Sequence, residues 1–170
     1  MELLRAGGND TAYATAVAAW PASAREVSLW CGRRDFPVPP QVVAAWRDEE
    51  DVEAYVARDA SGALVAYGEL WVDPGESEVE VARVVVSPGA RGRVVGRRFV
   101  SALAVRAREA TGCGDVFLRV HPDNTPALHS YRAAGFTPVA PALAAEWKAP
   151  QPVASVWLRH APGTGSPGGA

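Results

Sequence analysis

The first 50 residues of the chain carry their apolar residues in short blocks, which prolines and charged residues interrupt. Residues 1–5 predict a short strand, and the apolar spacing that follows is typical of helices that bury one face. Asn9, Asp10 and Thr11 can cap the first helix, because their side-chain oxygens accept hydrogen bonds from free backbone N–H groups. The helices predicted in this part are 11–20, 22–30 and 41–47.

From residue 52 onward the period of the apolar pattern changes from that of helices to that of strands. The runs are rich in valine, which suits a pleated and buried strand, and short turns with glycine, proline and aspartate separate them. Because strands joined by short turns run in opposite directions, the sheet is expected to be antiparallel up to residue 86. The predicted strands are 52–57, 63–72 and 79–86.

The second half of the chain predicts helices and strands in alternation. The helix expected from 91 to about 110 is followed by Gly112 and Gly114, which act as a stop signal. A strand at 115–120 comes next, and since strand–helix–strand crossovers are right-handed and join parallel strands, it is expected to lie parallel to 79–86. The remaining predicted elements are a helix at 125–134 and two last strands at 136–139 and 153–160.

Length and composition predict a single globular domain at 1–160 and a disordered tail at 161–170, which is rich in glycine, proline and serine. With a net charge of −2, the chain has no overall attraction to nucleic acid or to anionic membranes. No apolar run is long enough to span a bilayer. Cys31 and Cys113 have no neighbours at metal-binding spacing, so no metal is expected. The expectation is a cytoplasmic monomer or homodimer without nucleic-acid or membrane partners.

A glycine- and arginine-rich turn joins the strand at 79–86 to the helix that follows. Backbone N–H groups at a helix start carry partial positive charge and attract phosphate, and arginines add full charges there. The glycine spacing fits neither the P-loop nor the dinucleotide fingerprint. The alternative is an ordinary turn whose arginines are solvated. The candidate phosphate-binding residues are Arg91, Gly92, Arg93, Val94, Val95, Gly96 and Arg97.

The second informative stretch is the helix predicted at 125–134 and the residue before it. Asn124, Ala127 and Tyr131 are spaced so that they lie on one helix face over two turns. Ala127 is small enough for a thin ligand chain to pass, Asn124 can hydrogen-bond an amide, and Tyr131 presents a hydroxyl. Alternatively, Asn124 is a helix cap and Tyr131 a core aromatic residue.

Together these two stretches, which cover about residues 79–136, resemble the motifs of the GNAT superfamily of N-acetyltransferases. The first resembles R/Q-x-x-G-x-G/A, with Arg91 at the first position and Gly96 at the last. Val94 stands where the family usually has its first glycine, which is a departure from the pattern. The second is similar to N-x-x-A-x-x-x-Y-x-x-x-G-F and is matched by Asn124, Ala127, Tyr131, Gly135 and Phe136.

The resemblance implies an α/β GNAT fold: a mixed, mostly antiparallel sheet of about seven strands, flanked by helices, whose central parallel pair splays at a bulge around the cofactor. It implies acetyl-CoA as the acetyl donor, with its pyrophosphate on the backbone amides of 91–96. We expect Val94 to have helical φ, where a β-branched residue costs little. The pantetheine arm would pair with the backbone of Val84, Val85 and Val86.

The implied activity is transfer of an acetyl group from acetyl-CoA to a primary amine of an unidentified small molecule or protein. Glu80 is the first candidate for the base that takes the amine proton, and Glu69 on the neighbouring strand is its competitor. Tyr131 is the candidate acid for the departing thiolate. Two alternatives remain: a non-catalytic acyl-CoA sensor and an interaction domain without cofactor. Aromatic residues that could wall the acceptor site, or belong to the core, are Trp20, Trp30, Phe36, Trp46 and Trp71.

Overall fold

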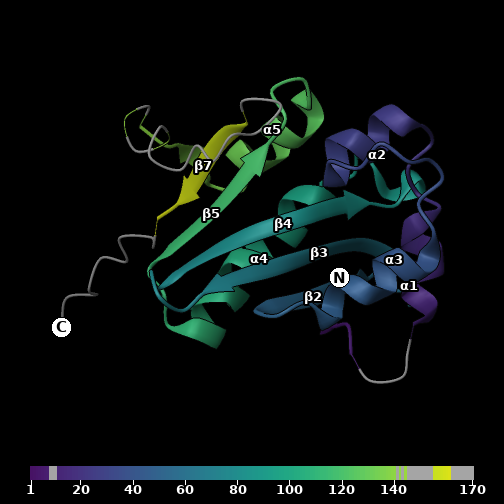
Figure 1. The fold of residues 1–170 in the computed structure, drawn as a ribbon, viewed down its shortest axis with the longest axis horizontal. Helices are drawn as coiled ribbons and strands as arrows, with labels where there is room; N and C mark the ends of the chain where they lie inside the picture. Colours follow the sequence, from purple (N-terminus) through teal and green to yellow (C-terminus); the bar gives the residue numbers. More distant parts are fainter. Residues whose placement is uncertain (8–10, 141, 143, 145–154, 162–170) are drawn as a thin grey trace.

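The computed structural model describes residues 1–7, 11–140, 142, 144 and 155–161. Within these residues the chain forms one seven-stranded sheet in the order β1-β2-β3-β4-β5-β7-β6 (Figure 1). All neighbouring strands are antiparallel except β4 and β5, which are parallel. This confirms the predicted fold class. The strands are β1 (Glu2–Arg5), β2 (Val52–Arg58), β3 (Leu64–Asp73), β4 (Glu78–Val86), β5 (Asp115–Val120), β6 (Thr137–Pro138) and β7 (Val156–His160).

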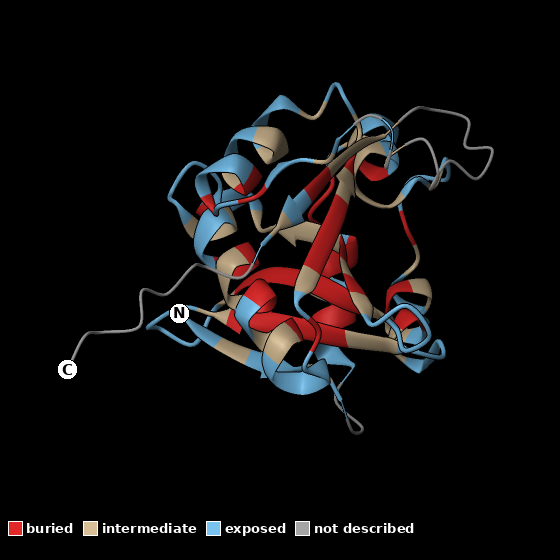
Figure 2. Cartoon of the chain, turned by 90° about the vertical axis from the view of Figure 1, so that its left-hand side faces the viewer, coloured by how far each residue is buried: buried red, intermediate tan, exposed pale blue. Residues whose placement is uncertain are grey.

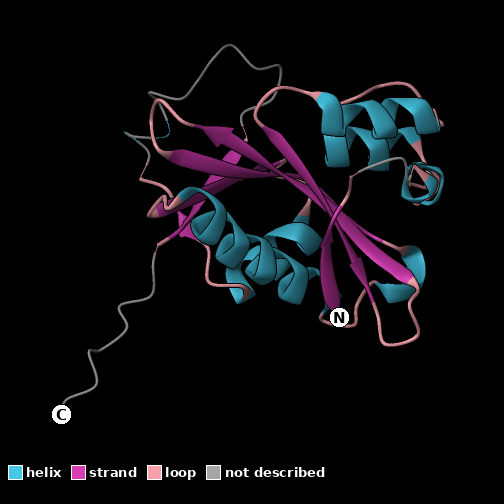
Figure 3. Ribbon diagram, turned by 90° about the horizontal axis from the view of Figure 1, so that it is seen from below, coloured by secondary structure: helices cyan, strands magenta, loops and turns pink. Residues whose placement is uncertain are grey.

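Helices cover both faces of this sheet, as Figure 3 shows. Their described bounds lie within about two residues of the prediction, apart from the start of the longest one. Two short 3₁₀ turns, Trp46–Asp48 and Pro88–Ala90, stand at the end of α3 and before α4. The helices are α1 (Ala12–Ala18), α2 (Ala24–Cys31), α3 (Pro40–Ala45), α4 (Val95–Thr111) and α5 (Thr125–Ala133).

Two apolar cores lie on the two faces of the sheet, because successive side chains of a strand point to opposite sides. Phe99 and Leu103 of α4 pack against Leu70 of β3 on one face. Tyr67 of the same strand joins Val17 of α1 on the other face. Figure 2 shows the buried residues concentrated in the central strands and on the helix faces that contact them. Helices therefore pack against the sheet on both of its faces.

The pairing of β3 with β4 contains a bulge. Tyr67 pairs with Val85 and Glu69 with Ala82, so two residues of β4, Arg83 and Val84, face only the glycine between Tyr67 and Glu69. A bulge bends its strand and increases the local twist. The bulge implied by the resemblance is thus present, and it lies directly before the end of β4.

The parallel pair of strands separates after a short contact. β4 and β5 pair from Glu78 with Asp115 to Glu80 with Phe117, and among the described residues the pairing goes no further. The residues of β4 after the bulge therefore have a free edge on the side of β5. Both the parallel direction and the splaying confirm the prediction.

The turn before α4 differs from the prediction. The helix was expected from residue 91, but it begins at Val95, and residues 91–94 form a turn. Val94 is the residue that caps the helix, and its φ of +64° lies in the left-handed region. The expectation of helical φ at Val94 is therefore wrong. The chain must reverse its course between the 3₁₀ turn and α4, and a left-handed residue makes that sharp change of direction.

Several predicted features fall on parts of the chain outside the described residues. They are the capping residues Asn9 and Asp10, the first residues of the strand expected at 153–160, and nearly all of the tail at 161–170. In the described part of the chain, none of the helices combines the length and the apolar character needed to cross a membrane.

Candidate active site

A cavity of about 650 Å³ opens where β4 and β5 diverge. Its walls come from α2, the end of β4, the turn before α4, and α5. Figure 1 shows α2 and α5 beyond the carboxyl ends of these two strands. Ligands of α/β proteins bind at this place in the sheet, and the volume is that of a small-molecule or cofactor site.

The cavity brings together most of the residues that the two sequence motifs single out. Among the predicted cofactor-binding residues, Arg93 and Val95 are the exceptions: Arg93 is exposed and outside the lining, and Val95 packs against the apolar core. The predicted cofactor-binding residues that line the cavity are Val84, Val85, Val86, Arg91, Gly92, Val94, Gly96, Arg97, Asn124, Ala127 and Tyr131. Their roles remain predictions, but their common location is a finding.

One end of the cavity is cationic and rich in backbone N–H groups. Gly92 and Val94 both have positive φ, a backbone form found in the concave N–H clusters that bind anions. Arg91 connects the turn to the end of β4 and to the residues before α2, since its guanidinium donates to the carbonyl oxygens of Val86 and Trp20 at 3.2 and 3.1 Å. This end therefore suits a phosphate or diphosphate group.

Another part of the cavity lining has a free backbone edge. The end of β4 at Val84–Val86 has an edge without a partner strand on the side of β5, and Ala127 of α5 lines the same cavity. Gly96 allows α4 and α5 to approach closely, because a Cβ at this position would stand 3.4 Å from Oγ of Ser130. Asn124 caps α5, as its Oδ1 accepts a hydrogen bond from the Ala127 N–H at 3.4 Å. The helix-cap role left open for Asn124 is therefore real, and its amide group also borders the cavity.

Tyr131 of α5 is one of the residues that line the cavity. Only 8% of the surface of Tyr131 is exposed, and its ring packs against that of Phe136. Burial raises the pKa of the Tyr131 hydroxyl well above its usual range. The group therefore keeps its proton near neutral pH and can donate a hydrogen bond to a nearby anion.

Glu80 lies on β4 outside the cavity lining, before the bulge. Its carboxylate accepts a charge-assisted contact from Nε of Arg119 at 2.9 Å, and its side chain is 19% exposed. Burial raises the pKa of Glu80, and the neighbouring Arg119 opposes that rise. Arg119 is itself held between the rings of Trp71 and Trp157, each 5.6 Å away. If Glu80 accepts a proton from an amine in the cavity, it would thus do so through a water molecule rather than by direct contact with the amine.

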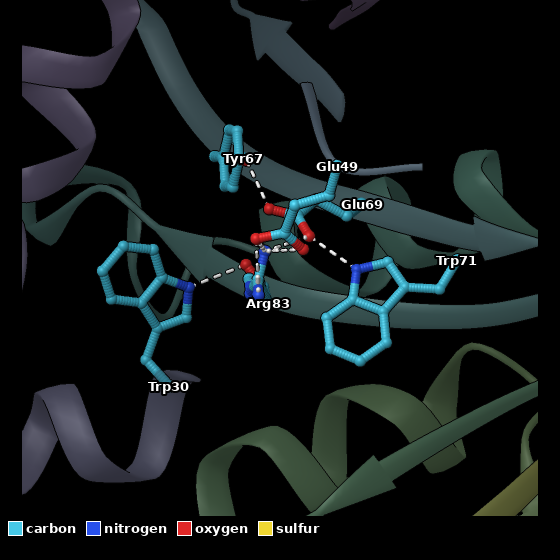
Figure 4. A network of polar contacts seen from close by, with 6 residues as sticks. All are labelled: Trp30, Glu49, Tyr67, Glu69, Trp71 and Arg83. Carbon is cyan, nitrogen blue, oxygen red and sulfur yellow. Dashed lines mark hydrogen bonds and ion pairs between the residues drawn. The ribbon is translucent and has the colours of Figure 1, made fainter. Parts of the chain in front are cut away.

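Glu69, the competing carboxylate, is fully buried. It accepts hydrogen bonds from the Tyr67 hydroxyl, from the Trp71 indole at 2.6 Å and from Arg83 at 3.0 Å (Figure 4). Burial raises the pKa of Glu69, whereas Arg83 and the other donors lower it. Because the carboxylate is fully buried and already accepts three hydrogen bonds, an amine or a water molecule has little access to it. Glu80 is therefore the more accessible of the two candidate bases.

Other residues of the cavity carry no motif in the sequence. Glu26 and Trp30 of α2 line it, as do Asp123 and His129 around the start of α5. Trp30 was predicted as an aromatic residue that could wall the acceptor site, whereas no sequence signal singled out the other three residues. Among the described residues, no group of three or more His, Cys, Asp or Glu side chains is placed to hold a metal ion.

The residues present fit acetyl-CoA as a ligand. A cationic turn at the start of a helix suits the diphosphate, a free strand edge suits the amide-containing arm, and a small residue at 127 leaves room for that arm. Tyr131 would then lie near the sulfur end.

Comparison with known proteins agrees with this geometry. The family model described as the acetyltransferase (GNAT) family matches residues 17–136. The chain is 30% identical over 116 residues to streptothricin acetyltransferase of Streptomyces lavendulae, covering 61% of this chain and 61% of that protein. It is 38% identical over 100 residues to mycothiol acetyltransferase of Gordonia bronchialis, covering 58% of this chain and 32% of that protein. The chain thus spans less than two thirds of the length of both relatives.

The fold is also similar to that of AAC(6')-Ib in complex with ribostamycin and coenzyme A. The TM-score is 0.73 with 16% sequence identity, over 94% of this chain and 92% of that one. A likeness at this identity establishes the fold, and it confirms the mixed sheet with one splayed parallel pair.

Proposed function

Because the chain belongs to the acetyltransferase (GNAT) family, we propose that it transfers the acetyl group of acetyl-CoA to a primary amine. The observation that carries the proposal is the cavity between β4 and α5. It combines a cationic turn, a free strand edge and the buried hydroxyl of Tyr131 in one place. Each of these features serves a different part of the same donor molecule.

Binding is the first task of these residues. The amides of residues 91–94 and the guanidinium groups of Arg91 and Arg97 hold the diphosphate. The backbone of Val84–Val86 pairs with the amide-containing arm, as one strand pairs with another. Acetyl-CoA, when bound, supplies an acetyl group that is activated as a thioester.

The proton transfers are the second task. Glu80 accepts the proton of the attacking amine through a bridging water, which leaves the nitrogen neutral and nucleophilic. Backbone N–H groups at the end of β4 stabilise the negative charge that develops on the acetyl oxygen. Tyr131 donates its proton to the departing sulfur and regains one from solvent.

A sensor that binds acetyl-CoA without turnover is the second candidate. It is favoured by one observation: the Glu80 carboxylate is engaged by Arg119 at 2.9 Å and does not line the cavity. In that case the cavity would bind the donor, but no base would serve an acceptor.

Two measurements on the wild-type protein separate these possibilities. Acetyl-CoA at about 100 times its dissociation constant should stabilise the fold by about 2.7 kcal/mol, which a melting curve detects. A panel of small amines and amine-bearing peptides then tests for release of the coenzyme A thiol. Stabilisation with thiol release supports the transferase, and stabilisation without release supports the sensor. No shift of the melting temperature with millimolar acetyl-CoA would overturn both.

A further inference from the structure

A cluster of aromatic and charged side chains surrounds Arg83, next to the cavity but outside it. Arg83 forms the bulge of β4 together with Val84, and its φ is +46°. Residues other than glycine rarely adopt this left-handed backbone conformation. Interactions with the surrounding residues must therefore stabilise it at Arg83. Val84, the next residue, already lines the cavity.

The guanidinium of Arg83 is held on several sides (Figure 4). Its Nη1 lies 3.0 Å from Oε2 of Glu69 and 3.2 Å from Oε2 of Glu49. Its Cζ lies 4.3 Å from the centroid of the Trp46 ring and 4.9 Å from that of Trp71. The side chain is only 16% exposed. Ionic and cation–π contacts together therefore fix the position of this group.

The main anchor of this cluster is Glu69 of β3. It is fully buried, and the Tyr67 hydroxyl and the Trp71 indole donate to it in addition to Arg83. A buried carboxylate that accepts hydrogen bonds from three donors has little freedom to move. Glu69 belongs to β3 and Arg83 to β4. Their contact therefore connects the two strands through side chains at the bulge, where the regular backbone hydrogen bonding between them is interrupted.

The backbone of Arg83 is held as well. Its carbonyl oxygen accepts a hydrogen bond from Nε1 of Trp30 at 2.7 Å. Trp30 belongs to α2, lines the cavity and packs edge-on against Trp46, with the ring centroids 5.3 Å apart. The bulge is thus joined to the helix that forms the opposite wall of the cavity.

We propose that Arg83 is a positioning residue, which holds the β4 bulge so that the backbone of Val84–Val86 faces the cofactor. The inference rests on the proposed function, in that the ligand of the cavity is a coenzyme A compound. Without its anchors, β4 would relax toward regular pairing with β3. Since the direction of backbone groups alternates along a strand, a shift of one residue would turn the wrong groups toward the cavity.

Three substitutions separate the contributions of the Arg83 guanidinium, of its planar geometry and of the hydrogen bond from Trp30. Arg83→Gly removes the guanidinium but tolerates the positive φ. Arg83→Lys keeps the charge and loses the planar fork that contacts two carboxylates. Trp30→Phe keeps an aromatic ring and removes the donor to the Arg83 carbonyl, but it also shortens a side chain that lines the cavity, so its effect counts only together with that of Arg83→Lys. Arg58→Gln is the matched control, because Arg58 bonds to the Gly62 carbonyl at the turn between β2 and β3, away from the cavity.

The measurements are the dissociation constant of coenzyme A, the KM and kcat with acetyl-CoA, and backbone hydrogen exchange, all well below the melting temperature. Arg83→Gly should raise the dissociation constant and KM by about tenfold or more, because a small misplacement of binding groups has a large effect. Exchange at the amides of Val84–Val86 should accelerate in the same variant. Arg83→Lys and Trp30→Phe should give intermediate values, and Arg58→Gln should match the wild type.

A lower melting temperature with unchanged KM, dissociation constant and exchange would make Arg83 a merely structural residue and overturn the inference. If Arg83→Gly does not fold, Arg83→Lys and Trp30→Phe carry the test with the same readouts. Failure of the wild type to bind coenzyme A would instead overturn the proposed function. Hydrogen exchange at Val84–Val86 still tests the bulge in that case, and equal exchange in wild type and variants would contradict its control by Arg83.

Discussion

The carboxylate of Glu26 lies 3.1 Å from the guanidinium of Arg91, at the end of the cavity that suits a diphosphate. The same oxygen, Oε2, accepts a hydrogen bond from the backbone N–H of Ala22 at 3.2 Å. The protein thus keeps an anion of its own where we expect an anionic ligand to bind. Part of the charge of Arg91 is therefore already engaged before the ligand arrives.

Glu26→Gln should tighten the binding of acetyl-CoA. The substitution removes a like charge near the diphosphate and frees Arg91, while glutamine can still accept the bond from Ala22. Both partners of the pair are partly exposed, so we expect a decrease in the dissociation constant of about two- to fivefold, or ~0.5–1 kcal/mol. Titration calorimetry at low and high salt checks this, and the gain should shrink at high salt. Glu109→Gln, on the exposed side of α4, is the control, and weaker binding by Glu26→Gln would show that the pair organises the site.

Val94→Gly should stabilise the free protein. A valine with a φ of +64° is strained by about 1–2 kcal/mol, and glycine removes this strain at a cost of about 0.4–1 kcal/mol through the unfolded chain. The net gain, from about 0 to about 1.6 kcal/mol, should appear as a higher melting temperature. Val94→Ala, which keeps a Cβ, should recover less of it. A lower melting temperature in Val94→Gly would mean that contacts of the valine side chain hold the turn.

Tyr131→Phe should leave acetyl-CoA binding nearly unchanged and lower kcat by about 10²-fold or more. The ring still packs against Phe136, but the proton donor is lost. The measurement is a comparison of kcat with the calorimetric dissociation constant for the two proteins. An unchanged kcat would assign Tyr131 to packing, which is the alternative that the sequence leaves open.

Glu80→Gln should lower the rate most in the pH range above the pKa of Glu80 and below that of the acceptor amine, where the wild-type carboxylate is ionised and most of the amine is still protonated. Burial raises the pKa of Glu80, so its carboxyl group becomes ionised only when the pH rises above that pKa. The wild-type rate should therefore increase with pH as Glu80 loses its proton. The variant lacks this dependence, and its rate should recover in part at high pH, where more of the amine is neutral without a base. A pH profile of kcat for both proteins checks the expectation. In the matched variant Glu69→Gln, loss of turnover while Glu80→Gln remains active would place the base on β3.

Local sequence patterns predicted the frame of the site well. The valine-rich strand, the break at Pro88 and the stop after α4 together specify a crossover, and the crossover makes β4 and β5 parallel. The helical spacing of Asn124, Ala127 and Tyr131 placed all three on the cavity wall. The resemblance to a GNAT family rested on these same residues, and the family match over 17–136 confirms it.

Other features depend on contacts between distant parts of the chain, which the local pattern does not record. Glu69 alternates with apolar residues like any solvent-facing strand residue, but Trp46 and its neighbours cover that face and bury it. The ion pair of Glu26 with Arg91 joins residues 65 positions apart. At Val94 the sequence suggested a residue that tolerates helical φ, but the geometry of the turn overrode the preference of a β-branched side chain.

The most direct test of the account is transfer of labelled acetyl from acetyl-CoA to an amine by the wild-type protein. Acetyl-CoA is supplied at a concentration that saturates the measured binding, and a panel of amines is added one at a time. We predict that label appears on at least one amine in step with release of an equal amount of coenzyme A thiol, and that Tyr131→Phe binds acetyl-CoA but loses both signals. Saturated binding with neither labelled amine nor thiol release across the panel would contradict the transferase and leave the acyl-CoA sensor.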